Sequence, residues 1–296
     1  MAKKIGSESQ VVIRRALSSD KDRVLEFCKN TWPGGDYIPD VWDAWIRGPK
    51  GSLLVASASG VPVGLGHYYF QTRKLVWLEG LRVDPAYRGR GIAGKVNGAL
   101  TKDAVAKGAV LAGLCTGIQN FASRRHVEKV GSKILQRFDR LDSTQALQRK
   151  PPNVSRLHKY EPGLWKFVRL QPEFPEFRGL YSDGWTWYPV TPQSLRRSAR
   201  GSGLVVANSG GETSSVGILS SEGRRLTLGF FAGEKSQAEH VARYSRYLLS
   251  KAGFQRVRTL LPHGSSLVGV FKKAAFKNAS SILVYQKKLG KSRKKG

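Results

Sequence analysis

The chain is short of cysteine, of acidic residues and of long apolar runs. Its only cysteines, Cys28 and Cys115, cannot build a disulfide framework, and no CxxC spacing indicates a metal site, so we expect none. Both lie among apolar residues, which predicts buried, reduced thiols. No apolar stretch reaches the roughly 20 residues of a membrane span, and no signal-peptide core follows the basic start. We therefore expect a soluble protein, cytoplasmic or alternatively nuclear.

Basic residues are abundant instead. Fifty Lys and Arg against 21 Asp and Glu give a net charge of +29, and six of the basic residues stand in the last ten positions. Without those six the charge is still about +23 (29 minus 6), so the excess is spread along the chain. This balance favours anionic partners and predicts nonspecific contact with polyanions through a basic surface. It leaves open whether the protein is a monomer or a dimer.

The chain is long enough for two domains of roughly 150 residues, and 40% hydrophobic residues can fill two cores. Periodicity and turn residues predict a mixed α/β fold for the first half. The expected strands are 11–14, 52–58, 61–70, 74–83, 109–115 and 133–141, and the expected helices are 20–30, 40–47, 91–107 and 120–130.

The last hundred residues repeat this order of strands and helices. Strands are expected near 204–208, 215–220, 225–231, 256–261 and 281–287, and helices near 236–251 and 266–274. Between the halves, proline and aromatic residues predict an irregular connector that packs against the first domain. The resulting domains are 10–141, a connector over 142–200, a second domain over 201–288 and a basic tail over 289–296.

One segment carries a chemical signature. The strand that ends at Val83 leads into Asp84-Pro85 and then into Arg88-Gly-Arg-Gly-Ile-Ala93, where a helix begins. Glycines let a backbone approach a bound group closely, and amides at a helix start favour anions. A pyrophosphate group is the anion that we expect this loop to bind. The segment is neither a Walker loop nor a dinucleotide fingerprint, because no Gly-Lys-Ser/Thr follows and no early βαβ unit precedes it.

This segment resembles motif A of the GNAT acetyltransferases, whose Gln/Arg-x-x-Gly-x-Gly/Ala loop binds the pyrophosphate of acetyl-CoA. Arg88, Gly91 and Ala93 occupy the defining places, and the resemblance covers about residues 11–141. Residues 34–39 and 78–83 are similar to histidine N-acetyltransferase-like proteins, which also carry a second domain without motif A. The corresponding segment here, 229–235, has two glycines but no motif A, so we expect it not to bind CoA.

The resemblance implies a GNAT acetyl-CoA-binding domain followed by a degenerate GNAT-like domain. It also implies that Leu81, Arg82 and Val83 offer backbone groups to the pantetheine arm. Asn120 matches a position that often contacts the cofactor near its thiol. The residues expected to hold the pyrophosphate are Arg88, Gly89, Arg90, Gly91, Ile92 and Ala93.

The resemblance also suggests catalytic residues. Glu79 stands where the family often places a general base, and an ion pair with a nearby arginine is the alternative role for it. The usual acid is a tyrosine seven residues after Asn120, where this chain has Val127. His126 is the neighbouring candidate. The other possible acids are Tyr68, Tyr69 and Tyr87. Direct transfer with a water as the proton acceptor is a further alternative.

In this fold the amine pocket lies between the first two helices and the cofactor strands. We expect Asp36 to hold an ammonium or imidazole group and Tyr37 to stack on a ring. A substrate carboxylate would need a cation, for which Arg82, Arg47 and His67 are candidates. The predicted function is acetyl transfer from acetyl-CoA to a small amine, histidine being one candidate. The alternatives are a protein or peptide acetyltransferase and a non-catalytic nucleic-acid-binding protein on the same scaffold.

Overall fold

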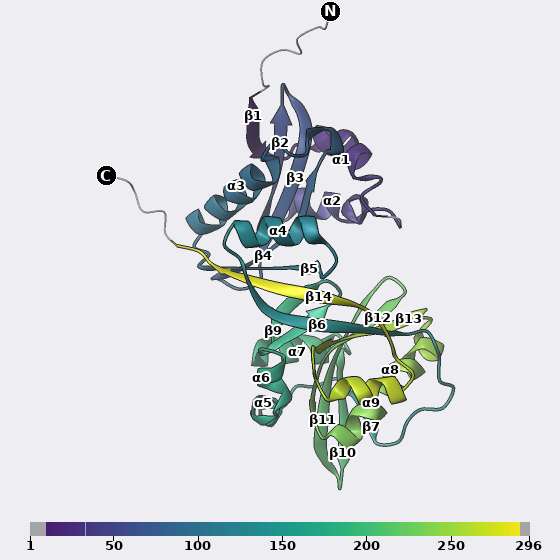
Figure 1. Ribbon diagram of the computed structural model, residues 1–296. Helices are drawn as coiled ribbons and strands as arrows, with labels where there is room; N and C mark the ends of the chain where they lie inside the picture. Colours follow the sequence, from purple (N-terminus) through teal and green to yellow (C-terminus); the bar gives the residue numbers. More distant parts are fainter. Residues whose placement is uncertain (1–9, 33, 291–296) are drawn as a thin grey trace, which may run out of the picture. The chain divides into compact units, whose positions relative to one another are not determined.

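The structure is a computed structural model that describes residues 10–32 and 34–290 (Figure 1). The expected basic tail lies outside the described residues from position 291 onward. The chain divides into two compact units. Of the described residues, the first holds those up to Leu114, Ala122–Lys133 and those from Gln286 onward, and the second holds Cys115–Phe121 and Ile134–Tyr285. Among the described residues, no helix has the length and apolar character of a membrane span.

The sheet of the first unit has the strand order β1-β2-β3-β4-β5. Its neighbours are antiparallel except β4 and β5, which are parallel. The order of elements agrees with the one that the sequence predicts. The elements are β1 (Val11–Arg15), α1 (Lys21–Cys28), α2 (Ile38–Arg47), β2 (Gly51–Ala58), β3 (Val61–Phe70), β4 (Leu75–Val83), α3 (Ile92–Ala106), β5 (Leu111–Gly117) and α4 (Phe121–Lys129), with 3-10 turns at Ser18–Asp20 and Pro85–Tyr87.

Two glycines of β3 let α3 pack close to the sheet. Side chains alternate along a strand, so Gly64 and Gly66 face one side and Leu65 faces the other. A Cβ atom at Gly66 would lie 2.8 Å from Cδ1 of Leu100 and 2.9 Å from Cγ1 of Val96. Helix α3 therefore covers the face that the glycines leave open.

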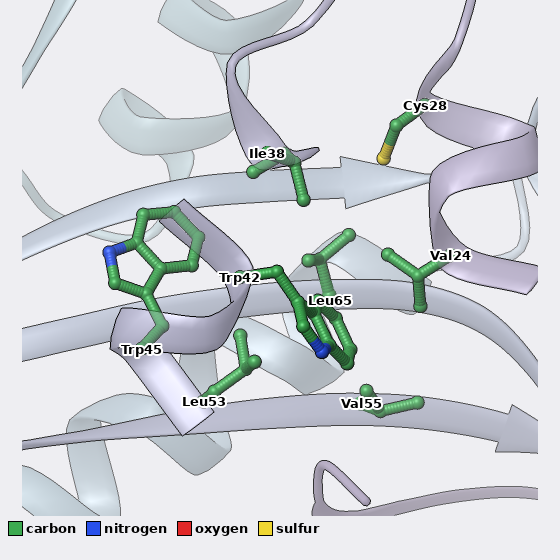
Figure 2. Packing of buried hydrophobic residues seen from close by; sticks show 8 residues of the cluster. All are labelled: Val24, Cys28, Ile38, Trp42, Trp45, Leu53, Val55 and Leu65. Carbon is green, nitrogen blue, oxygen red and sulfur yellow. The ribbon is translucent and has the colours of Figure 1, made fainter. Parts of the chain in front are cut away.

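Helices α1 and α2 bring the side chains that cover Leu65 on the other face (Figure 2). Trp42 is the largest fully buried side chain of this cluster. Cys28 is also fully buried there, and burial, followed by the charge of Asp36, raises the pKa of its thiol to about 12. Both cysteines are free thiols, but Cys115 is only half-buried, so the expectation of burial is met at Cys28 alone.

The second unit repeats the order of the first. Strands β10, β11 and β12, helix α8 and the parallel strand β13 follow one another as β2, β3, β4, α3 and β5 do. The sheet order is β14-β6-β13-β12-β11-β10-β7, and β8 and β9 form a separate hairpin. The elements are β6 (Lys133–Ser143), β7 (Val154–Leu157), α5 (Pro162–Leu170), α6 (Glu173–Glu176), β8 (Leu180–Asp183), β9 (Thr186–Pro189), α7 (Pro192–Arg200), β10 (Leu204–Ser209), β11 (Glu212–Glu222), β12 (Arg225–Gly233), α8 (Lys235–Ala252), β13 (Arg256–Pro262), α9 (Leu267–Lys273) and β14 (Lys277–Lys288).

Segment 142–200 differs from the irregular connector that we expected. It forms the helices α5 to α7 and the strands β7 to β9, and it groups with the second unit. The reason lies in its aromatic residues. The ring centroids of Phe177 and Trp187 lie 6.1 and 5.3 Å from that of Phe138 on β6, and Phe177 also packs on Phe230 of β12 at 5.0 Å. The prolines of α5 and α7 stand in the first turn, where a missing amide hydrogen costs little.

A polar network ties α3 to the sheet of the first unit. Asp103 Oδ2 accepts hydrogen bonds from Tyr68 Oη at 2.6 Å, Ser52 Oγ at 2.7 Å and Lys107 Nζ at 2.9 Å. Burial alone would raise the pKa of Asp103, but these bonds outweigh it and lower the pKa to about 2. The charged form of Asp103 is therefore the form that the fold stabilises.

We predict that Asp103→Asn destabilises the protein at neutral pH and much less in acid. The folded-state pKa of about 2 lies below the model-peptide value of 3.8, so the contribution is complete above pH 3.8 and disappears as pH falls through 2. Urea unfolding of both proteins between pH 2 and 7 measures this. The exposed Asp22→Asn serves as the control, and a stability difference that stays constant over the range would refute the assignment.

Candidate active site

The turn between β4 and α3 is held at its start by the buried Asp84. Its Oδ1 accepts a hydrogen bond from the amide of Ala86 at 2.9 Å, and its own amide donates to the Val63 carbonyl at 2.9 Å. Arg23 of α1 pairs with the same carboxylate. A hollow of about 250 Å³ is bordered by Arg23, Asp84, Ala86 and Arg88, among others. The direction in which the chain leaves β4 is thus fixed by a buried charge.

Two glycines shape the rest of this turn. Gly89 has φ +78° and Gly91, the N-cap of α3, has φ +73°, a region that residues with side chains rarely adopt. A Cβ atom built on either would meet nothing within 4 Å. The inner surface of the loop is therefore backbone that faces open space.

The loop is suited to an anion. Among the described residues, the amides from Gly89 to Ala93 donate to no protein acceptor, and no side chain caps α3. In the described part of the chain, the exposed Arg88 and Arg90 each donate one hydrogen bond to a backbone carbonyl at 3.4 Å and form no ion pair, and Arg90 also lies over the Tyr87 ring. Unpaired amides, the helix dipole and two available cations together fit a pyrophosphate group.

Strand β4 leaves one edge open next to this loop. Its pairing with β5 covers only Leu75–Trp77, and in the described part of the chain residues 78–83 have no ladder partner on that side. Leu81, Arg82 and Val83 stand on this stretch. Within that stretch the Leu81 carbonyl accepts from Arg82 Nη1 at 3.1 Å and the Val83 carbonyl from Arg88 Nε at 3.4 Å. The assignment of this stretch to the pantetheine arm stays a prediction.

A bulge in β4 turns its side chains toward the first two helices. The register against β3 shifts just before the His67–Glu79 pair, and Gly80 lies in the shift with φ +67°. A Cβ atom at Gly80 would come within 2.5 Å of the Trp45 indole. The missing side chain therefore admits Trp45 against the strand.

Glu79 has a buried histidine behind it. Its Oε1 lies 2.9 Å from Nδ1 of His67, and the side chains of Glu79 and His67 are 19% and 4% exposed. Trp45 stacks on the imidazole with a centroid distance of 4.3 Å and an interplanar angle of 10°. The carboxylate of Glu79 is thus oriented by a fixed ring and keeps partial access to solvent. Of the two roles considered for Glu79, a pairing with an arginine does not occur among the described residues.

Asp36 and Arg82 form a bidentate pair. Nε and Nη2 of Arg82 donate to the two oxygens of Asp36 at 2.7 and 3.1 Å, and the Asp36 side chain is 1% exposed. Burial tends to raise the pKa of Asp36, but the hydrogen bonds and charge of Arg82 lower it below the usual value. Asp36 therefore anchors Arg82, which differs from the amine contact that we expected. Tyr37 remains exposed, 5.4 Å from the guanidinium carbon of Arg82.

The candidate acids occupy different places. Tyr68 is fully buried and donates to Asp103 on the α3 side of the sheet, so it does not share the face of Glu79. Tyr87 lies under Arg90 at 5.0 Å, in the turn before α3. Val127, at the position of the usual tyrosine, is buried.

His126 and Asn120 stay predictions. Burial, and then the charge of Lys129, lowers the pKa of His126, and its buried Nε2 has no hydrogen-bond partner in the part of the chain that the structure describes. No hydrogen bond connects His126 with Glu79. Asn120 falls in segment 115–121, which groups with the second unit. Within the described ranges there is no cluster of three or more His, Cys, Asp or Glu side chains suited to a metal ion.

In the second unit, other parts of the chain contact the backbone just before α8. A Cβ atom at Gly233, before α8, would lie 2.3 Å from the Ser214 carbonyl oxygen. The amide of Gly233 donates to Oε2 of the buried Glu173 at 3.1 Å. A carboxylate of the protein thus stands near the helix start, where the first unit leaves its amides unpaired. That the segment binds no CoA stays a prediction.

We predict that Asp36→Asn destabilises the protein by about 3–5 kcal/mol, because it leaves the largely buried Arg82 charged and unpaired. The double variant Asp36→Asn/Arg82→Met should lose less than the single one. Urea unfolding of the set gives the coupling energy. The exposed pair Lys21–Asp43 is the matched control, and Asp43→Asn should cost less than about 1 kcal/mol. Equal losses for the two single variants would contradict a buried pair.

Comparisons with known proteins place the first unit in a family. Residues 21–131 match the acetyltransferase (GNAT) family. Over 80 residues, 27% of this chain, the sequence is 31% identical to human probable N-acetyltransferase 16 and 30% identical to histidine N-acetyltransferase of Xenopus tropicalis. The matched stretch spans 22% and 25% of those two proteins.

Solved structures resemble the whole chain. A GCN5-related N-acetyltransferase from Sphaerobacter thermophilus matches with a TM-score of 0.64 at 12% identity, over 95% of this chain and 96% of that one. A tandem GNAT protein from the clavulanic acid biosynthesis pathway matches with 0.59 at 11% identity, over 96% and 100%. The predicted fold class, a mixed α/β GNAT domain followed by a GNAT-like region, is confirmed. Residues 21–131 therefore carry a domain of the GNAT acetyltransferase family.

Proposed function

We propose that this chain is an N-acetyltransferase that moves the acetyl group of acetyl-CoA to the amine of a small molecule, with L-histidine as the first acceptor to test. The main support for this proposal is the arrangement of groups along β4. Glu79 stands on the stretch that β5 leaves unpaired, and the same strand runs directly into the open loop before α3. One strand therefore sets the spacing between a carboxylate and an anion-binding loop.

Enzymes of this family use acetyl-CoA, which supplies the acetyl group as a thioester. In this chain the amides from Gly89 to Ala93 and the side chains of Arg88 and Arg90 would hold its pyrophosphate. The unpaired edge of β4, from Leu81 to Val83, would align the pantetheine arm by backbone hydrogen bonds. Such positioning by itself contributes much of the rate of a transfer between two bound groups.

The transfer forms a carbon–nitrogen bond, breaks the carbon–sulfur bond and releases one proton from the amine. We assign Glu79 as the group that takes this proton, directly or through a water. His67 is a positioning residue, because its buried ring fixes one carboxylate oxygen and leaves the other to the site. The proton for the leaving thiolate comes from a group that we leave unassigned, and His126 stays a candidate.

The residues near Arg82 favour an acceptor substrate that has a flat ring. Trp32 and Tyr37 are exposed, and both rings lie about 6 Å or less from the guanidinium carbon of Arg82. Aromatic surfaces beside a fixed cation suit an imidazole ring. The relatives named histidine N-acetyltransferase point to the same acceptor, although they match over 80 residues only.

The direct test is thiol release from acetyl-CoA by the full chain against a panel of amines. The panel holds the free amino acids, polyamines, aminoglycosides and a lysine peptide. We expect histidine to accelerate thiol release, and Glu79→Gln to lower kcat by about 10²–10⁴-fold with little change in the KM for acetyl-CoA. Another preferred amine would retain the acetyltransferase and reject histidine. No turnover with any amine, together with no CoA binding, would reject the proposal.

The donor site has its own prediction. Gly91→Ala places a side chain on the open loop surface at φ +73°, so we expect the Kd for CoA to rise at least tenfold, measured by titration calorimetry. Gly98→Ala is the matched control, because Gly98 lies in the same helix with open space around it and no positive φ. It should leave CoA affinity unchanged and slightly stabilise α3. Equal affinities for the two variants would exclude the loop as the binding surface.

A further inference from the structure

Helix α7 of the second unit carries a stripe of arginines around a hollow. Gln193, Arg196, Arg197 and Arg200 line a hollow of about 410 Å³. These positions follow the i, i+3, i+4, i+7 spacing and therefore share one helix face. All four side chains are exposed, whereas the opposite face of α7 is buried. We call these three arginines the α7 stripe.

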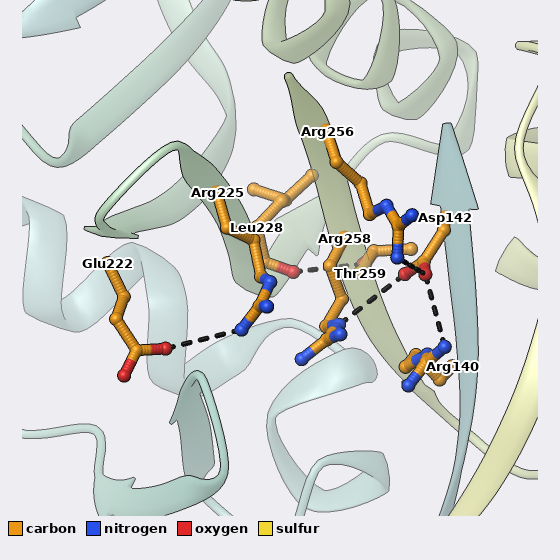
Figure 3. A network of polar contacts seen from close by, with 8 residues as sticks. All are labelled: Arg140, Asp142, Glu222, Arg225, Leu228, Arg256, Arg258 and Thr259. Carbon is orange, nitrogen blue, oxygen red and sulfur yellow. Dashed lines mark hydrogen bonds and ion pairs between the residues drawn. The ribbon is translucent and has the colours of Figure 1, made fainter. Parts of the chain in front are cut away.

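No carboxylate neutralises the α7 stripe. Among the described residues, none of the three arginines has an ion-pair partner within 4 Å. Figure 3 shows the contrast elsewhere in the same unit, where three guanidinium groups surround Asp142 at 3.2–3.4 Å. The positive charge of the stripe is therefore available to an external anion.

The guanidinium groups are partly fixed in place. Arg196 lies over the ring of Tyr160 at 5.0 Å, and Arg197 over the ring of Tyr188 at 5.5 Å. Arg197 Nη2 also donates to Tyr181 Oη at 2.6 Å. A guanidinium that is already held against a ring loses less rotamer freedom when it binds a ligand. A solvated face that served solubility alone would not need this ordering.

We propose that the α7 stripe binds the phosphate backbone of a nucleic acid strand, independently of the acetyl-transfer site. Three cations extend over about 6 Å of helix between positions 196 and 200, since the rise is 1.5 Å per residue. Successive phosphates of one strand in a duplex are about 3.4 Å apart along its axis, so the stripe covers about two phosphate spacings, which join three successive phosphates to the three arginines. Arginine matches phosphate oxygens with paired N–H donors. A net charge of +29 brings such a polyanion to the surface from a distance.

The test is fluorescence anisotropy of a labelled 20-nucleotide single strand, and of the matching duplex, with the full chain between 50 and 200 mM salt. We expect Arg196→Gln/Arg197→Gln/Arg200→Gln to flatten the plot of log affinity against log salt by about 2–3, because each lost phosphate contact removes roughly 0.7–0.9 from the slope. Affinity at 0.1 M salt should fall at least tenfold.

A matched control separates the stripe from general charge. Lys272→Gln/Lys273→Gln/Lys277→Gln removes the same three charges from exposed positions of the same unit and should change the slope by less than 1. Equal effects of the two triple variants would overturn the proposal, as would an unchanged slope for the arginine variant. Displacement of the strand by poly-glutamate at the same charge concentration as by unlabelled DNA would instead indicate an acidic protein partner and reject the nucleic acid.

A second variant covers the possibility of misfolding. Arg197 bonds to the buried Tyr181, so the triple variant is compared with Arg196→Gln/Arg200→Gln, which keeps that bond. The double variant should lose about 1.4–1.8 of the slope and keep the unfolding midpoint of the native chain. Loss of slope only together with loss of the folded state would count against the stripe.

Discussion

The site depends on one missing side chain, that of Gly80. With a left-handed backbone at this position, β4 bulges away from strict register with β3. The space that a Cβ atom would take holds the Trp45 indole, 2.5 Å from the position of that atom. Trp45 in turn stacks on His67, and His67 orients Glu79. A residue with a side chain at position 80 would strain the backbone and push this column of rings apart.

The same bulge explains why two polar pairs meet on one face of the unit. A regular strand would point residues 79 and 82 to opposite faces, because their spacing is odd. The extra residue in β4 brings both toward α1 and α2, where Asp36 holds Arg82 and His67 backs Glu79. The bulge thus places both polar pairs at the end of β4, next to the stacked rings of Trp45 and His67.

Features that depend on adjacent residues could be predicted from the sequence. Contacts between residues that lie far apart in the chain could not. The loop from Arg88 to Ala93 could be recognised because glycines, arginines and a helix start stand next to each other in the sequence. The Asp36–Arg82 pair joins residues 46 positions apart, and sequence pattern alone assigned Asp36 to an amine. The prediction of an irregular connector over 142–200 was wrong for a related reason. Its prolines are local signals for a break, whereas its aromatic residues pack on β6 and β12, which no local pattern reveals.

The two units differ in the groups that stand before their long helices, although the order of their elements is the same. Before α3, the amides have no acceptor and the glycines face open space. Before α8, the buried Glu173 accepts from the Gly233 amide, and the backbone at Ser214 takes the remaining room. A carboxylate of the protein that is bound there competes with any external phosphate at no cost in association entropy. We therefore expect anions to bind the second unit through side chains, as proposed for α7, instead of through the backbone before α8.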